Sequence, residues 1–327
     1  RMEMEKVPAA GYPIDGLWIS GLQRKLTLKN LSFPFKLISS MMKARSIIKK
    51  FKPDVAIGTG GYASGPMLRV ASKKGVPSLI QEQNSFPGIT NRILGKTVDS
   101  ICVAYEGMEK YFPAPRITIT GNPVRKEILD IDGKEREATD FFKLDKHRKT
   151  ILIIGGSQGA RSVNLAISNL INKILDEDIQ LIWQCGKPFA GQAEKVVQEL
   201  PEEKSQRVHV HAFISRMDLA YAAADLVISR AGAIAISELC LAGKPALLVP
   251  LPIAAEDHQT KNALALQDKD AGILIADDKQ EEELLPALRA LLHDEARRKS
   301  MGENIRKLAL PDATEKIVDE IVKLLDR

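Results

Sequence analysis

The feature that most constrains the fold of this chain is a regular alternation of short aliphatic runs with amphipathic segments. The runs are four to six residues long, and segments with helical spacing of apolar residues, such as Ala160–Ile174 and Gln192–Glu199, lie between them. Aliphatic runs of this length are typical of strands buried on both faces, and their alternation with helices predicts α/β domains with parallel, doubly wound sheets. The predicted strands are Val55–Gly58, Ser78–Gln81, Ser100–Val103, Ile117–Thr120, Thr150–Ile154, Ile179–Gln184, Arg207–Val210, Leu226–Ser229, Ala246–Val249 and Gly272–Ile275.

Length and composition favour two globular domains. The chain has 327 residues, of which 44% are hydrophobic, so a sizeable core is expected in each domain. The polar stretch Asp130–Lys149 is predicted to be a linker region between them. No apolar run approaches the ~18 residues that a membrane-spanning helix requires.

The terminus and the cysteines indicate the compartment. Residues Arg1–Glu5 carry acids without the apolar core of a signal peptide. Cys102, Cys185 and Cys240 are odd in number and far apart, which argues against a disulfide framework and a CxxC zinc site. A reduced, soluble, cytosolic protein is therefore expected.

Three glycine-rich loops follow predicted strands. They are Gly58–Pro66, Gly155–Arg161 and Ser229–Ile234. In open parallel sheets ligands bind at the carboxyl ends of strands, where glycine lets the backbone approach a phosphate and free helix N–H groups supply partial positive charge. Similar turns also occur as plain packing devices. None matches the P-loop pattern GxxxxGK[ST], and the second lacks the full GxGxxG spacing of a dinucleotide-dependent dehydrogenase.

The third loop carries an additional signal, because Glu238 lies five residues beyond Ala233. A carboxylate in the first turns of this helix would lie near a ligand held at the helix N-terminus, and carboxylates suit ribose hydroxyls as acceptors. The alternative is an acid that merely complements the helix dipole.

Candidate metal ligands and nucleophiles are weak. Asp130–Asp132 and Asp176–Asp178 resemble the DxD that many sugar-nucleotide enzymes use for a divalent metal, but both lie in polar connecting stretches, where solvated turns are the better interpretation. His209 and His211 would share one strand face without a third ligand nearby in sequence. His258 follows a strand-end loop and could reach a ligand. No GxSxG or HExxH motif is present, and we predict neither a metal site nor a cofactor.

Charge is distributed unevenly along the chain. Residues 1–125 contain 19 Lys or Arg against 8 Asp or Glu, whereas the remainder contains 28 against 34. Between Asp15 and Asp54 there is no acidic residue but nine basic ones, interleaved with apolar residues. A basic, amphipathic segment of this kind suits docking on anionic lipid. Packing of Ile47, Ile48 and Phe51 in a core is one alternative, and nucleic-acid binding is a weaker one because no recognition motif accompanies the segment.

Seven short blocks, in order along essentially the whole chain, resemble the MurG family of bacterial glycosyltransferases. This family adds N-acetylglucosamine to undecaprenyl-pyrophosphate-linked muramyl-pentapeptide. The blocks are Gly60–Pro66, Glu82–Asn84, Gly121–Arg125, Gly155–Ala160, Gly232–Ala233 through Ser237–Glu238, Asp257–Gln259 with Asn262–Ala263, and Pro311–Thr314.

The resemblance implies a GT-B architecture, in which two Rossmann-like domains face a cleft. Residues 1–124 would form an acceptor and membrane-side domain, residues 125–310 a nucleotide-sugar-binding domain, and residues 311–327 a helix returning to the first domain. The implied reaction is inverting and metal-independent. It transfers N-acetylglucosamine from UDP-N-acetylglucosamine to the C4 hydroxyl of the lipid-linked acceptor in peptidoglycan synthesis, and so serves cell wall biogenesis, cell shape and cell division. The implied location is the cytoplasmic face of the inner membrane, where the protein would be peripheral.

The resemblance also assigns site residues. Arg125 and Ser157 would contact the UDP portion of the donor, the helix start at Gly232, Ala233 and Ile234 would hold the pyrophosphate, and Glu238 would bind the ribose. The remaining donor contacts would be Ile214 at the uracil, Gln259 and His258 at the sugar hydroxyls, and Asn84. The acceptor side would comprise Gly60, Gly61, Tyr62, Ser64 and Glu82, with Asn84 facing it as well.

Two departures from the family pattern stand out. The family opens with a glycine-rich G-G-T-G-G-H loop whose histidine is a candidate general base, and this chain begins at Arg1 without such a motif. We therefore assign no catalytic base and expect a truncated or incompletely recorded N-terminus; a chain truly lacking the base would lose roughly 10²–10⁴ in rate. In addition, Ala231 stands where a serine is expected, which would remove one phosphate contact.

Other functions stay open at the level of sequence. Another GT-B enzyme, such as a UDP-sugar:diacylglycerol transferase, would share the donor loops but not the Gly60–Pro66 and Glu82–Asn84 blocks. A non-catalytic nucleotide-sugar-binding subunit would need a partner to supply the missing loop. A nucleotide-sugar epimerase would share the fold, but the basic amphipathic segment would then have no purpose.

Overall fold

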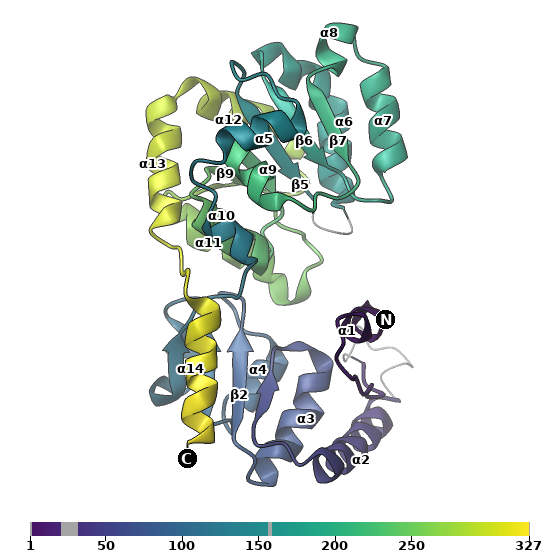
Figure 1. The fold of residues 1–327 in the computed structure, drawn as a ribbon, viewed down its shortest axis with the longest axis vertical. Helices are drawn as coiled ribbons and strands as arrows, with labels where there is room; N and C mark the ends of the chain where they lie inside the picture. The colour runs from purple at the N-terminus through teal and green to yellow at the C-terminus, as the bar shows by residue number, and fades with distance from the viewer. Residues whose placement is uncertain (1, 21–31, 156–158, 327) are drawn as a thin grey trace. The chain divides into compact units, whose positions relative to one another are not determined.

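The computed structural model describes residues 2–20, 32–155 and 159–326, which form two compact units (Figure 1). The first unit is made by the described residues of 1–82, 87–119 and 315–327, and the second by those of 83–86 and 120–314. The expected boundaries at 124/125 and 310/311 lie within a few residues of these divisions. The short segment 83–86, expected in the first domain, makes its contacts in the second unit.

The first unit contains a parallel sheet of four strands in the order β1-β2-β3-β4. Successive residues of β2 and β3 point to opposite faces, so that Ile80 and Ile101 pack under α3 and α4, whereas Leu79 and Cys102 pack against Leu324 of α14. The C-terminal helix therefore belongs to the first unit's core. The bounds are β1 Ala56–Gly58, α3 Gly61–Lys73, β2 Ser78–Glu82, α4 Ile89–Leu94, β3 Ser100–Val103, β4 Ile117–Ile119 and α14 Ala313–Leu325.

Two further helices belong to this unit, α1 (Met2–Ala9) and α2 (Phe33–Phe51). Helix α2 packs against α3 through the small inner face formed by Ala44 and Ile48. It has proline at its first turn and ends at Lys52, which takes a left-handed conformation (φ 50°) directly before Pro53. Ser40 is also buried and donates from its hydroxyl to the Trp18 carbonyl, whereas Phe35, Ile38 and Met42 are exposed.

The second unit contains a parallel sheet of six strands in the order β10-β9-β8-β5-β6-β7. Chain order starts at β5, continues outward to β7, and then returns to β8 on the other side of β5. This is the doubly wound order in which the direction of winding reverses once, between β5 and β8. The bounds are β5 Thr150–Ile154, β6 Gln180–Gln184, β7 Val208–His211, β8 Leu226–Ser229, β9 Ala246–Leu248 and β10 Ile273–Leu274.

Helices cover both faces of this sheet. In β5, Ile151 and Ile153 face the core formed with α6, α7 and α12, and Leu152 and Ile154 face the core formed with α5, α9, α10 and α11. The doubly wound α/β class predicted from the alternating pattern is confirmed, and all ten predicted strands are present with ends that differ by at most one residue. The helices are α5 Glu135–Phe142, α6 Arg161–Ile174, α7 Ala190–Gln198, α8 Glu202–Ser205, α9 Met217–Ala223, α10 Ala233–Ala242, α11 His258–Gln267, α12 Gln280–His293 and α13 Glu295–Arg306, with 3₁₀ turns at Met108–Lys110, Ala114–Arg116, Lys126–Leu129, Leu175–Glu177 and Ala255–Asp257.

The predicted linker at Asp130–Lys149 is wrong. This stretch contains helix α5, and Ile131, Ala138 and Phe142 are buried in the second unit's core against α9. The helix is short and half of its residues are charged, so its polar composition concealed a buried face of only two residues, Ala138 and Phe142. Residues 130–149 are therefore part of the packed structure of the second unit.

No helix within the described ranges is both long enough and apolar enough to cross a membrane.

Candidate functional site

The reversal of winding in the second unit fixes where a ligand site can form. The carboxyl ends of β5 and β8 lie side by side, and the loops that leave them run in opposite directions to α6 and α10. Loops that diverge in this way open a crevice above the strand ends, which is where open α/β sheets bind ligands. Two of the three glycine-rich loops predicted from the sequence, Gly155–Arg161 and Ser229–Ile234, are these loops.

The loop after β5 requires its glycines because the backbone passes close to the end of β6. Gly159 has a φ of +73°, and a Cβ placed there would lie 2.4 Å from the carbonyl oxygen of Cys185. A Cβ on Gly155 would lie 2.4 Å from the amide nitrogen of Ala160. A side chain at either position would push the loop off the strand ends. Ser157, predicted to contact UDP, lies outside the described residues.

The loop after β8 leads into a helix start that has no side-chain cap. Gly232 is the N-cap of α10, and its carbonyl accepts the first helical hydrogen bond from the Ile236 amide. Within the described part of the chain, no acceptor engages the amides of Ala233 and Ile234. Gly232 faces open space and Ile234 is 44% exposed. Uncapped amides at the positive end of a helix form an anion-binding geometry.

Glu238 lies in the second turn of α10 and is almost fully buried. Its Oε2 accepts a hydrogen bond of 3.2 Å from the Tyr221 hydroxyl, and its Oε1 lies 3.6 Å from Nε of Arg125. Oε1 has no hydrogen-bond donor within the structure described. Burial raises the pKa of Glu238, and the neighbouring Arg125 and Tyr221 only partly oppose this. A buried carboxylate oxygen without a donor is able to accept one from a ligand.

The segment 83–86 is attached to this region by two asparagines. Asn122 donates to the Gln83 carbonyl and to Ser237 Oγ on α10, both at 3.0 Å. Asn262, which is fully buried, accepts from the amide and hydroxyl of Ser85 and donates to Asn84 Oδ1 and to the Ala231 carbonyl. Asn84 therefore lies two hydrogen bonds from the loop after β8, through one shared side chain.

Three other predicted donor residues lie beyond the ends of neighbouring strands, one in a loop and two in the first turn of α11. Ile214 follows β7 and is buried, and its amide donates to Gln184 Oε1 at the end of β6. Gln259, on α11, accepts from the Leu251 amide through its own Oε1, which fixes the loop after β9. His258 is the first residue of α11. The structure thus brings the described donor-site residues to one end of one sheet, but ligand contacts stay predictions.

The predicted acceptor residues lie in the first unit. Gly60 is the N-cap of α3 with a φ of +86°, Gly61 follows with +75°, and Tyr62 is 60% exposed. Ser64 donates from its hydroxyl to the Gly60 carbonyl, which fixes this helix start. Glu82 is buried at the end of β2, where it accepts hydrogen bonds from Asn91 Nδ2 and the Gly88 amide.

Comparison with known proteins agrees with this geometry. Residues 1–103 match the glycosyltransferase family 28 N-terminal domain, and residues 150–317 match the C-terminal domain of the same family. A UDP-N-acetylglucosamine--N-acetylmuramyl-(pentapeptide) pyrophosphoryl-undecaprenol N-acetylglucosamine transferase from Christiangramia forsetii is 54% identical over 326 residues, which cover 100% of this chain and 87% of that protein. The protein of the same name from Flavobacterium psychrophilum is 52% identical with the same coverage. The crystal structure of Acinetobacter baumannii MurG has 30% identity, covers 98% of this chain and 88% of that one, and has a TM-score of 0.76.

The chain belongs to the MurG family. The resemblance inferred from seven short blocks is confirmed, and with it the GT-B class of fold and the assignment as a glycosyltransferase.

The DxD-like stretches have partners of their own in this MurG-family chain. Asp132 is exposed and pairs with Arg306, which lowers the pKa of Asp132 through hydrogen bonding and charge. Asp176 pairs with Lys204, and Asp178 with Arg148 and Arg207. Among the described residues, no group of three or more His, Cys, Asp or Glu side chains is placed to hold a metal ion.

Four residues around the candidate donor site were assigned no role at the level of sequence, although Asn262 lies in one of the seven blocks. Tyr221 is buried beneath Glu238, and Asn262 joins Asn84 to Ala231. Arg230 and Asp277 form an ion pair at the ends of β8 and β10. Arg230 had a detectable signal, because a basic residue directly precedes a glycine loop expected to bind an anion. The others contact partners distant in sequence, which a pattern of spacing does not reveal.

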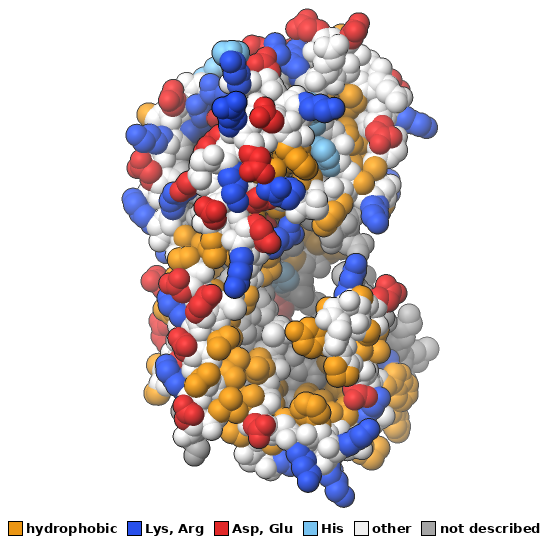
Figure 2. Space-filling view, in the orientation of Figure 1, with side chains coloured by type: hydrophobic (Ala, Val, Ile, Leu, Met, Phe, Trp, Pro, Cys, Tyr) orange, Lys and Arg blue, Asp and Glu red, His pale blue; other side chains and the backbone are white. Residues whose placement is uncertain are grey.

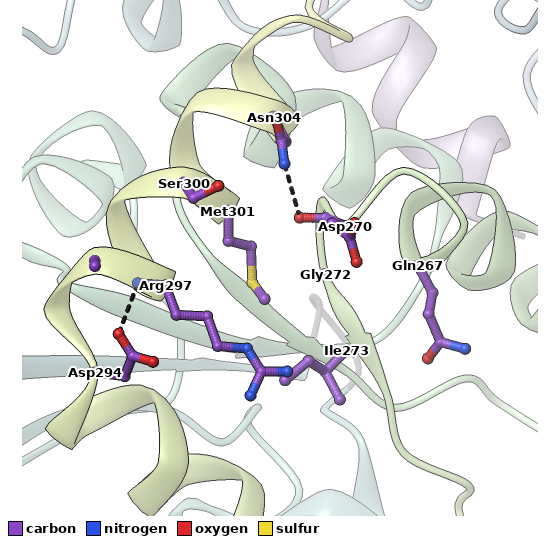
Figure 3. Close-up of a pocket in the computed structure, with 10 residues that line it drawn as sticks. Gln267, Asp270, Gly272, Ile273, Asp294, Arg297, Ser300, Met301 and Asn304 are labelled. Atoms are coloured by element: carbon purple, nitrogen blue, oxygen red, sulfur yellow. Dashed lines mark hydrogen bonds between the residues drawn. The ribbon is translucent and has the colours of Figure 1, made fainter.

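One depression of the second unit is separate from this site. It has a volume of about 540 Å³ and lies between α13 and the edge strand β10, and Met301 and Ile273 are among the residues that line it (Figure 3). Asp294 accepts from the Arg297 amide, and Asn304 donates to the Asp270 carbonyl across its rim. No residue assigned to the donor or acceptor lines it.

Proposed function

We propose that this chain transfers N-acetylglucosamine from UDP-N-acetylglucosamine to the C4 hydroxyl of undecaprenyl-pyrophosphoryl-linked muramyl-pentapeptide, with inversion at the anomeric carbon. The observation that carries the proposal is identity of about half of all residues, over the whole chain, to proteins named for this reaction. The second unit supports the donor half of it, because a buried carboxylate and an uncapped helix start meet at the reversal point of a doubly wound sheet.

In this proposal the donor lies across the strand ends of the second unit. The uracil contacts Ile214, the ribose hydroxyls donate to Glu238, and the diphosphate meets the amides of Gly232–Ile234 together with Arg125. Gln259 and His258 contact the sugar hydroxyls. When the acceptor hydroxyl attacks the anomeric carbon, the bond to the diphosphate breaks and negative charge grows on the departing UDP. Oriented amides and the Arg125 guanidinium stabilise this charge without a divalent metal.

Helix α2 supports a membrane-facing role for the first unit. Phe35, Ile38 and Met42 follow one another at helical spacing and are 71%, 58% and 59% exposed. The same stripe continues into Arg45 and Lys49. Apolar and basic side chains lie together over this part of the surface (Figure 2). Exposed apolar area bordered by cations favours partial insertion among anionic lipid headgroups, and we propose that the protein is peripheral on the inner face of the cell membrane.

The reaction is tested with the purified chain, labelled UDP-N-acetylglucosamine and a short-chain analogue of the lipid-linked acceptor, in the presence of EDTA. The expected product is the β-linked disaccharide. Transfer to diacylglycerol instead would favour the other GT-B lipid transferase. UDP-N-acetylglucosamine binding without transfer, restored by an added partner, would favour the non-catalytic subunit. Transfer that requires a divalent ion would contradict the metal-independent mechanism.

Lipid docking is tested separately by co-sedimentation with vesicles of 30% phosphatidylglycerol. The variant Ile38→Ser/Met42→Ser should bind more weakly by roughly 30-fold or more, because each of the two apolar side chains contributes about 1–2 kcal/mol when buried in lipid. Val318→Ser/Val322→Ser on α14 is the matched control, since these side chains are similarly exposed at 49% and 46% but are bordered by acidic residues. Equal loss in both variants would show that exposure alone, and not the α2 surface, determines binding.

A further inference from the structure

The side chain of Arg230, two residues before α10 begins with its N-cap Gly232, makes hydrogen bonds to residues outside that helix. Only 12% of the side chain is exposed. Its Nη1 donates to the carbonyls of Val249 and Pro250 at 3.0 and 3.1 Å and to Asp277 Oδ1, and its Nη2 donates to Ser162 Oγ at 2.6 Å. Nη1 carries two hydrogens, and three acceptors already share them. Both terminal nitrogens of this guanidinium are therefore engaged within the protein.

Asp277 is the second centre of the same network. Its Oδ1 accepts from Arg230, from the Ser162 hydroxyl at 2.7 Å and from Gln280 Nε2 at 3.2 Å. Ser162 is the second residue of α6, and Gln280, which is almost fully buried, is the first residue of α12. The network thus joins the segments that follow β5, β8, β9 and β10.

The network reaches the starts of both helices that follow the glycine-rich loops of the candidate donor site. Ser162 stands three residues after Gly159, and Arg230 two residues before Gly232. Neither α6 nor α10 has a side-chain cap at its N-cap residue, so capping does little to fix these two helix starts. A diphosphate that contacts both helix starts requires them at one fixed separation, and loops that are already fixed bind it without an added ordering cost.

We propose that Arg230 and Asp277 are positioning residues of the donor site, which hold the starts of α6 and α10 and the loop after β9 in the geometry that seats a nucleoside diphosphate. Arg230 acts on the ligand through the backbone and not as a phosphate ligand. This inference rests on the donor placement proposed above. In this inference Asp277 favours UDP binding by positioning the loops, although its negative charge repels the ligand.

The sign of one effect distinguishes positioning from direct charge contact. If Arg230 bound phosphate directly, removal of Asp277 would release the guanidinium and remove a nearby negative charge, and UDP would bind more tightly or equally. If the pair positions the loops, Asp277→Ala must weaken UDP binding although it makes the site more positive. Arg230→Lys provides a second distinction between the two hypotheses. Lysine keeps the positive charge but lacks the planar guanidinium that contacts four acceptors at once, so direct charge contact predicts little change in UDP affinity and positioning predicts a loss.

The experiment measures UDP dissociation constants by calorimetry on the full chain, with melting temperatures as a check on folding. We expect Asp277→Ala and Arg230→Lys each to raise the dissociation constant about tenfold, which is about 1.4 kcal/mol. The double variant should lie within about threefold of the weaker single variant, because either change breaks the same network. Ser162→Ala removes one link and should raise the constant a few-fold, which keeps the test available if a stronger variant fails to fold.

Arg207→Lys is the matched control. Arg207 is equally buried and also contacts a backbone carbonyl and a carboxylate, but it stands at the start of β7, at the opposite end of the sheet. Its replacement should lower the melting temperature and leave the UDP dissociation constant within twofold. Unchanged or tighter UDP binding by Asp277→Ala would overturn the proposal. Glu238→Gln separates the two levels of inference: if it weakens UDP binding and Asp277→Ala does not, the donor site stands and only the positioning role fails.

Discussion

Glu238→Gln should make the protein more stable and a weaker binder of UDP. The substitution keeps the shape of the side chain and its hydrogen bond with Tyr221, and it removes a charge that is 5% exposed. Arg125 is about half exposed and 3.6 Å away, a geometry that contributes no more than about 1 kcal/mol and does not offset the burial of the carboxylate. We expect the free energy of unfolding at pH 7 to rise by about 1 kcal/mol, because relieving a buried charge at a functional site typically stabilises by this order.

The effect on binding has the opposite sign. Hydrogen bonds to a charged acceptor contribute about 1.5–3 kcal/mol, so loss of the carboxylate should raise the UDP dissociation constant roughly 10–100-fold. Urea denaturation and calorimetry on the same preparation measure both effects. Tyr221→Phe is the control, which should lower stability by about 1 kcal/mol and change UDP affinity little. A Gln variant that is less stable and binds UDP normally would refute the reasoning, since Glu238 would then be a structural acid.

Three further predictions follow from single contacts. Affinity for UDP-N-acetylglucosamine should fall as the pH drops through the raised pKa of Glu238, because the protonated acid is a weaker acceptor for the ribose hydroxyls. The diphosphate of this ligand does not titrate over the same pH range, so calorimetry of Glu238→Gln should show an affinity that does not change with pH. Asp218→Asn should lower the free energy of unfolding at pH 7 by about 2 kcal/mol, because Arg216 lowers the pKa of Asp218 to about 2 in the folded protein. This stabilisation is complete above pH 3.8 and is lost as the pH falls through 2. Urea denaturation of both proteins at several pH values measures it. Gly159→Ala should weaken UDP binding by tenfold or more, because Gly159 has a φ of +73° and the added Cβ would lie 2.4 Å from the Cys185 carbonyl oxygen. Gly191→Ala is the control: Gly191 faces open space in α7, and its replacement should leave the UDP dissociation constant measured by calorimetry unchanged.

The strands were predictable from the sequence because buried parallel strands require uninterrupted aliphatic runs, such as Thr150–Ile154. Helix α5 was not predictable, since only Ala138 and Phe142 mark its buried face. The glycine loops and Glu238 were found because backbone approach and ribose recognition demand particular residue types at particular spacings. Their supports were not found. The partners of Asn262 and Arg230 lie 31 to 178 and 19 to 68 residues away, and only the folded chain brings them together.

The two ends of the second unit's sheet differ in how completely their polar groups are satisfied. At the amino ends of the strands, Gln180 makes four hydrogen bonds through its amide group, and Asp225 accepts from the Thr150 amide. At the carboxyl ends, Glu238 Oε1 lacks a donor and the first amides of α10 lack acceptors within the described chain.

The unpaired groups at the carboxyl ends of the strands are not a general cost of this fold, because Gln180 and Asp225 at the amino ends have their hydrogen bonds. They lower the stability of the unliganded protein and are available to a ligand that carries two hydroxyl donors and an anionic acceptor. A ligand that satisfies them must stabilise the folded state by RT ln(1 + [L]/Kd), which is about 2.7 kcal/mol at a hundredfold excess over the dissociation constant. UDP should therefore raise the melting temperature, and uridine, which supplies the hydroxyls without the phosphates, should give a smaller shift at equal concentration. A shift of equal size for both would mean that the uncapped start of α10 takes no part in binding.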